Sequence, residues 1–257
     1  MDAEDVTTPS AATLAELPEA SAAGTLGQIY AELRQFAGTP VVALIFRHLA
    51  THPGLLEEIW SSLRPLMMTG LLQDTAWRLA AESVPAHLVP PLSRDLQATI
   101  GFAGETRQPM LNAIDAYNRA NPANLLVILS LLHRIRDSAP ARAVSQKAWT
   151  PPAPVPTPLS PMLKPTDMAP HIRRLVNDIG FGDRSTLDTV VPSLLRHLAG
   201  APGLLAILHT VLRPAFRDGS LQGATDALRA RMQAAAAELA PHIGPLPRLA
   251  GNAPAIA

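Results

Sequence analysis

The 257-residue sequence contains no cysteine. Disulfides, thiolate nucleophiles, thiolate-ligated zinc and thiol redox chemistry are therefore excluded. An excess of one charge is also missing, because 21 Lys and Arg balance 21 Asp and Glu, which leaves no surplus for a nucleic-acid-binding face. No apolar run approaches the roughly 18 to 20 residues of a membrane span. The acidic start Met1–Asp5 does not look like a secretory signal. We predict a cytoplasmic protein that binds neither nucleic acid nor membrane.

Aromatic residues are scarce, at 4%, although hydrophobic residues make up 47% of the chain. The core must therefore consist mostly of Ala, Leu, Val and Ile. Proline is abundant, with 26 residues, about twice its usual share. Many prolines fit short helices separated by helix breakers better than they fit sheets. No segment shows the alternating pattern of a half-buried strand, so an all-α fold is expected.

A long internal repeat organises the chain. Residues 41–81 return as residues 190–230 with a constant offset of 149, and 18 of these 41 aligned positions are identical without a gap. The best-conserved part is Arg47–Ala50, which returns as Arg196–Ala199. Self-similarity of this length indicates a duplicated unit.

The repeat and the prolines together predict the organisation. We expect two tandem helical repeats that pack as an intramolecular pseudo-dimer, joined by a proline-rich strap. Residues 151–170 contain eight prolines in 20 positions, which favours an extended, semi-rigid strap. The expected segments are a disordered N-terminus (1–22), repeat 1 (23–148), the strap (149–170), repeat 2 (171–250) and a frayed tail (251–257).

Two familiar kinds of site are disfavoured by the local sequence. His48 and His52 have a spacing that zinc sites use, but a third ligand and an acidic base are missing between them, so no metal site is expected. His48 and His197 are equivalent in the repeat, and a symmetric structural role fits them better. Ser193 has no His and Asp arrangement beside it, so a serine nucleophile is not expected.

Arginines and one asymmetric segment are stronger candidates. Arg47 and Arg196 have two open interpretations: a bidentate carboxylate site, or a helix-surface arginine paired with a local acid. Tyr117, Asn118 and Asn121 have no counterpart in the second half, and function can enter where the pseudo-symmetry is broken. Asn121 also precedes Pro122, a pattern typical of an N-cap that opens a new helix.

The repeated Arg-x-Leu-Ala segments, the Pro-rich join (151–165) and Ala120-Asn121-Pro122 occur in an order that resembles the group I 2-haloacid dehalogenase family, which acts on D or on both stereoisomers. The resemblance covers most of residues 25–245. It implies an all-helical pseudo-dimer with the active site between the repeats and no cofactor. In the proteins of that family, an aspartate of the second repeat activates water, which displaces the halogen directly with inversion. An asparagine of the first repeat holds water or substrate.

The sequence departs from the family at the aspartate. In the family the aspartate follows a serine just before Arg-x-Leu-Ala; here the serine is Ser193 and the next residue is Leu194. Leucine cannot accept a proton, and losing a general base costs about 10²–10⁴ in rate. Asp115 and Asp188 are the possible substitutes. By resemblance, four residues would line the substrate pocket: Tyr117, Asn118, Asn121 and Ser193.

Two functions follow. The first is hydrolysis of a carbon–halogen or related bond in a small 2-substituted acid. The alternative is a non-catalytic homologue that binds a small organic acid or serves as a helical interaction domain. A peroxidatic helical protein of the alkylhydroperoxidase type needs cysteine and is excluded. The expected partner is a small acid in a pocket between the repeats, and a homodimer is possible.

Overall fold

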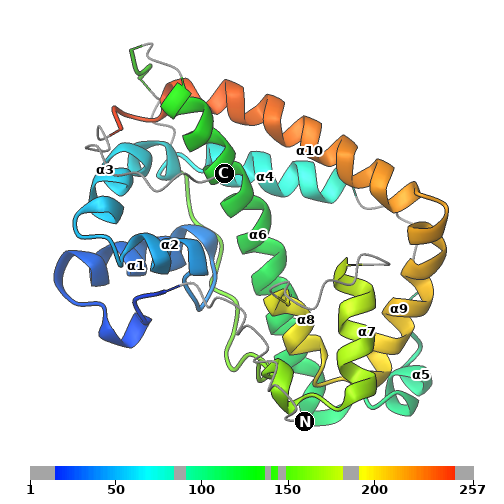
Figure 1. Ribbon diagram of the computed structural model, residues 1–257. Helices are drawn as coiled ribbons and strands as arrows, with labels where there is room; N and C mark the ends of the chain where they lie inside the picture. The colour runs from blue at the N-terminus through cyan, green and yellow to red at the C-terminus, as the bar shows by residue number, and fades with distance from the viewer. Residues whose placement is uncertain (1–14, 84–90, 137–139, 144–148, 182–190, 247–257) are drawn as a thin grey trace, which may run out of the picture.

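The computed structural model describes residues 15–83, 91–136, 140–143, 149–181 and 191–246 (Figure 1). Every regular element in this part of the chain is a helix, which confirms the predicted all-α class. None of these helices is both long and apolar enough to cross a membrane. The α-helices are α1 (Gly24–Ala37), α2 (Leu44–Leu49), α3 (Leu55–Met67), α4 (Leu71–Glu82), α5 (Arg94–Thr99), α6 (Arg107–Arg136), α7 (Pro170–Phe181), α8 (Ser193–Leu198), α9 (Pro202–Arg217) and α10 (Ser220–Leu239). The 3₁₀-helices are η1 (Glu19–Ser21), η2 (Gly104–Thr106), η3 (Pro165–Asp167) and η4 (Ala240–His242).

Helix α6 occupies the middle of the molecule, with α1–α3 on one side and α7–α9 on the other (Figure 1). The bounds of α2 and α8 differ by the 149 residues of the sequence repeat. Helices α4 and α10 also begin alike, because each follows a left-handed glycine, Gly70 (φ 71°) and Gly219 (φ 77°). Left-handed φ is easily adopted by glycine and strained for other residues.

The hydrophobic core consists of two clusters. The first joins α1–α4 with the C-terminal half of α6 and with α10, through residues such as Leu126 and Met232. The second joins the N-terminal half of α6 to α7, α8 and α9, through Met110 and Leu205. The clusters therefore cross the predicted domain limits: Met110 belongs to predicted repeat 1 but packs in the second cluster, and Met232 does the reverse.

The N-terminal region differs from the prediction of disorder over residues 1–22. Residues 1–14 lie outside the described residues, but residues 15–22 contact the folded helices. The Leu17 amide donates to the Arg47 carbonyl at 2.9 Å, and the Glu19 carboxylate accepts from the Val42 amide at 2.7 Å and from Arg34 at 2.6 Å. Residues 15–22, which the prediction places in a disordered terminus, therefore have hydrogen-bond partners in α1, in α2 and at Val42 before α2. The predicted tail, 251–257, lies outside the described residues.

The predicted helix start at Asn121 is also wrong. Asn121 lies inside α6, and the helix continues through Pro122. The neighbours of this part of α6 override the local preference, since Ala123, Leu126 and Val127 are buried in the first cluster.

The proline-rich segment 149–164 has no regular secondary structure and attaches at three places. The amide of Val155 donates to Gly38, that of Ser160 to Pro109 and that of Leu163 to Arg196, at 2.9, 3.0 and 3.1 Å. These bonds connect the segment to both sides of α6.

Candidate functional site

The structure brings Tyr117 and Ser193 together from distant parts of the sequence. Tyr117 lies near the middle of α6, and Ser193 is the first residue of α8, which packs against α6. The Ser193 hydroxyl interacts with the Tyr117 hydroxyl. The ring of Tyr117 also packs edge-on against His197 of α8, with a centroid distance of 5.5 Å and an interplanar angle of 62°. We call Tyr117, Ser193, Arg196 and His197 the α6–α8 cluster.

Two repeat-equivalent arginines, Arg196 and Arg47, contribute positive charge near Tyr117. Burial raises the pKa of the Tyr117 phenol, whereas the Ser193 hydroxyl, Arg196 and Arg47 oppose that shift. The phenol therefore stays protonated at neutral pH and remains a hydrogen-bond donor. A half-buried hydrogen-bond donor in the positive potential of two arginines is suited to an anionic ligand.

The two arginines retain free donors in different ways. Arg47 pairs with Glu16 through one terminal nitrogen at 3.0 Å. For that nitrogen, the interpretation of a helix-surface arginine paired with a local acid applies. Its Nε is buried and without a hydrogen-bond partner. Arg196 uses its Nε to donate to the Leu163 carbonyl at 2.9 Å. Among the described residues, no partner contacts its terminal nitrogens, which carry the guanidinium fork.

His197 is fixed on one side by the segment that precedes α7. Its Nδ1 lies 2.6 Å from the Ser160 carbonyl oxygen and 3.3 Å from the Ser160 hydroxyl. The residue is only 7% exposed. Burial lowers the pKa of His197, although the bond to Ser160 opposes this, and nearby Arg196 lowers it further. The imidazole is therefore neutral at pH 7.

The repeat-equivalent His48 makes a similar bond, with Nδ1 2.7 Å from the Ala15 carbonyl. Each Arg-His pair is thus held by the segment before its unit: Leu17 donates to Arg47, and Leu163 donates to Arg196. The ring of His48 packs edge-on against His52 at 5.4 Å instead of against a tyrosine.

Other predicted site residues are not brought into the cluster. Asn118 and Asn121 are exposed on α6. The carboxylate of Asp115 is paired with Arg119 at 2.9 and 3.1 Å, and Arg119 also donates to the Ala153 carbonyl. Helical residues that are two positions apart in the sequence point about 200° apart around the helix axis. Asp115 and Tyr117 therefore point in different directions. Asp188 lies outside the described residues.

Leu194, the residue where the family resemblance predicts an aspartate, packs against the second hydrophobic cluster. It is half-buried there, although Ser193 beside it interacts with Tyr117. Consecutive helical residues point about 100° apart, which explains why the two neighbours have different surroundings.

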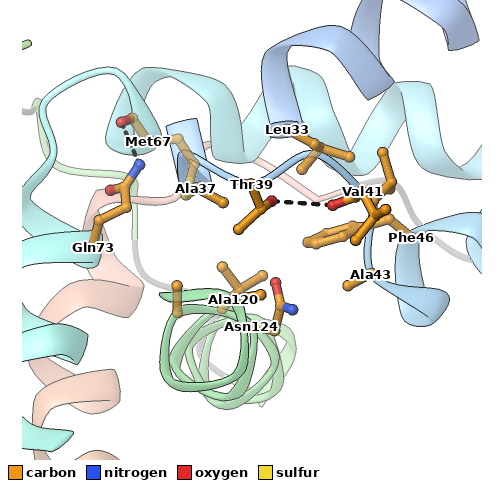
Figure 2. A pocket seen from close by; sticks show the side chains of 13 residues that line it. Leu33, Ala37, Thr39, Val41, Ala43, Phe46, Met67, Gln73, Ala120 and Asn124 are labelled. Atoms are coloured by element: carbon orange, nitrogen blue, oxygen red, sulfur yellow. Dashed lines mark hydrogen bonds between the residues drawn. The ribbon is translucent and has the colours of Figure 1, made fainter. Parts of the chain in front are cut away.

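A separate cavity lies inside the first half of the molecule, lined by α1, α6 and the 37–46 segment (Figure 2). Its polar residues are Thr39, Gln73 and Asn124 (Figure 2). Gln73 is fully buried; its Nε2 donates to the Met67 carbonyl at 3.0 Å, and its Oε1 has no partner. The volume open to water is ≈ 20 Å³, about enough for one water molecule. The cavity is too small for an organic acid.

Sequence reasoning missed His197 as a member of the site. It assigned the residue only a symmetric structural role, because the repeat alignment pairs it with His48. The available signal was the asymmetry of its surroundings: Leu44 stands where the second half has Ser193.

A family model described as halocarboxylic acid dehydrogenase DehI matches residues 40–151. An (R)-2-haloacid dehalogenase of Pseudomonas putida is 26% identical over 103 residues. That match covers 38% of this chain and only 34% of the relative.

Solved structures agree in fold. A D-2-haloacid dehalogenase mutant, and a complex of such a mutant with D-2-CPA, each superpose with a TM-score of 0.65 at 20% identity, covering 89% of this chain and 80% of theirs. A D-2-haloacid dehalogenase complex with L-LA gives 0.64 at the same identity and coverage. Together with the family model and the curated relative, these matches support a relationship to the group I D-2-haloacid dehalogenase family.

Proposed function

We propose that this protein is a haloacid dehalogenase-like hydrolase that binds a small 2-substituted carboxylic acid at the α6–α8 cluster. The observation that carries the proposal is the packing of α8 against α6, which places the Tyr117 ring against His197 and near Ser193, where Arg196 and Arg47 contribute positive charge. The arginines attract the carboxylate, and the tyrosine and serine hydroxyls supply hydrogen bonds that fix its orientation. The relative bound to D-2-CPA supports this ligand class.

A second candidate is acid binding without hydrolysis. Leu194 favours it, because an aliphatic side chain in the second hydrophobic cluster provides no proton acceptor. The binding site is the same in both proposals, and only the bond-breaking step distinguishes them.

We also propose that the site formed by duplication of one helical unit. The equal offset of α2 and α8, the matching glycines before α4 and α10, and the equivalent bonds of Leu17 and Leu163 support this origin. The two copies differ at Ser193, which aligns with Leu44 in the first half. In this proposal the active site arose where the copies diverged.

Binding and chloride release test the proposal separately. Calorimetric titration with D- and L-2-chloropropionate and with lactate should show saturable binding. Arg196→Gln removes a charged hydrogen-bond donor, worth about 1.5–3 kcal/mol, so affinity should fall about 10- to 100-fold. Arg213→Gln is the matched control, because Arg213 is exposed on the neighbouring α9, and it should bind like the parent.

Chloride release from chloropropionate by the parent protein supports hydrolysis, and binding without release supports the second candidate. Absence of saturable binding to any of these acids would refute both. Equal loss of affinity in Arg196→Gln and Arg213→Gln would refute the placement of the site.

A further inference from the structure

We propose that His197 is the general base of this protein, with its Nε2 atom accepting the proton of the water that attacks the substrate carbon. The inference rests on the proposed hydrolytic function. It assigns the water-activating role to an imidazole of α8 instead of a carboxylate. The observations that carry it are the fixed Nδ1, the unpartnered Nε2 and the position of the ring beside Tyr117.

The contact with Ser160 determines which ring nitrogen is available. A carbonyl oxygen only accepts hydrogen bonds, so the 2.6 Å contact requires a proton on Nδ1. In a neutral ring the lone pair then lies on Nε2. Among the described residues, no group forms a hydrogen bond with Nε2. The backbone thus fixes the ring orientation and leaves the basic nitrogen open, which is the arrangement a general base needs.

The surroundings keep this nitrogen unprotonated. The residue is 7% exposed, and the charged group beside it is Arg196 on the same helix. From α6 the ring faces Tyr117, whose burial keeps the phenol protonated. From the segment before α7 it faces the neutral Ser160. No carboxylate among the described residues contacts the ring to stabilise the imidazolium.

The two halves of the molecule show that this arrangement is more than a structural bond. His48 makes the equivalent bond to Ala15. This bond therefore explains only the role that both histidines share, which is to hold the segment before their repeat. Only His197 packs against a tyrosine that in turn interacts with a serine. At the Ser193-equivalent position, the first half has Leu44, which is 39% exposed.

The proposed step is balanced. The water oxygen forms a bond to C2 of the 2-haloacid as the carbon–halogen bond breaks, and the electron pair of that bond leaves with the halide. The water proton passes to Nε2 of His197. The products are a 2-hydroxy acid of inverted configuration and halide, and the imidazolium then returns its proton to solvent. No oxidant, reductant or metal is needed.

His197→Asn provides the sharpest test. The Asn amide nitrogen occupies nearly the same place as Nδ1 and keeps the donor to Ser160, whereas the basic nitrogen is lost. We expect the rate of chloride release from 2-chloropropionate to fall about 10²–10⁴-fold, with lactate affinity within about threefold of the parent. His48→Asn, which makes the same replacement in the other half, should leave both values unchanged.

A pH profile of the parent protein gives an independent readout. Because burial lowers the pKa of His197, kcat should rise with pH through an apparent pKa below about 6.5 and stay level above it. The histidine titration observed by NMR and lost in His197→Asn should have the same midpoint. This measurement decides the matter even if His197→Asn fails to fold.

The possible results are distinct. Unchanged chloride release in folded His197→Asn, or a flat pH profile across the His197 titration, would overturn the assignment and leave the proposed function intact. Lactate binding without any chloride release by the parent would overturn the assignment and leave only acid binding. Absence of binding would reject the site itself.

Discussion

At the residue scale, Gly70 and Gly219 allow a direct comparison between the two halves. Both have left-handed φ, at 71° and 77°. A Cβ at Gly70 would overlap the indole of Trp149, whereas a Cβ at Gly219 would meet open space. Alanine in this conformation costs about 1–2 kcal/mol, and overpacking costs about 1–3 kcal/mol more. Gly70→Ala should therefore lower the free energy of unfolding by clearly more than Gly219→Ala.

Urea denaturation followed by far-UV circular dichroism measures both changes. Gly219→Ala serves as the control for backbone strain alone. Equal destabilisation by the two substitutions would show that Trp149 does not pack against Gly70 in solution.

The candidate site was only partly predictable from the sequence at this scale. The asymmetry between the halves singled out Tyr117, the family resemblance added Ser193, and the packing of α8 on α6 brings the two residues near each other. The same reasoning selected Asn118 and Asn121, which are exposed. Local sequence reveals which residue types are unusual, but the direction of a side chain depends on the phase of the helix that carries it. The directions of Tyr117, Asn118 and Asn121 around one helix could not be deduced, because the sequence predicted that a new helix begins at Asn121.

At the element scale, α6 shows how tertiary contacts overrule a local breaker. Pro122 lacks the amide that would bond to the Asn118 carbonyl, and a proline inside a helix costs about 3 kcal/mol relative to alanine. The helix nevertheless continues, because its C-terminal half is buried against α4 and α10 in the first cluster. The sequence shows the local cost of Pro122 but not the burial that offsets it.

Pro122→Ala should therefore stabilise the protein, by up to about 3 kcal/mol. The new amide restores a main-chain bond, and the change removes the clash of the ring with the preceding turn. Thermal unfolding monitored by circular dichroism checks the prediction through a raised Tm. Ala120→Ser, two residues earlier on α6, is a control for disturbance of this helix and should not raise Tm. A lower Tm for Pro122→Ala would mean that the ring contributes packing that outweighs the lost bond.

At the scale of the whole molecule, the division of the core differs from the division of the sequence. Composition and periodicity predicted the helical class, and the repeat made residues 44–49 equivalent to residues 193–198, because both follow from local patterns. It did not predict that α10 packs on α4 and α6, or that α6 contributes to both clusters. Those contacts join residues far apart in the chain, and helical periodicity contains no information about which distant helix a face will meet.

Shared helices should make the two clusters unfold together. Leu205 is fully buried in the second cluster and Leu56 in the first, and a Leu→Ala change at such a position costs about 2–5 kcal/mol. Trp60 is buried in the first cluster, and Trp149 packs against that cluster. Because α6 contributes to both clusters and α10 of the first cluster contacts α9 of the second, Leu205→Ala should shift the urea midpoint of tryptophan fluorescence as far as that of far-UV circular dichroism. Leu56→Ala is the matched control, because it makes the same change inside the first cluster, where Trp60 and Trp149 report on unfolding. If Leu205→Ala moved the circular dichroism curve and left the fluorescence midpoint in place, the halves would be independent folding units.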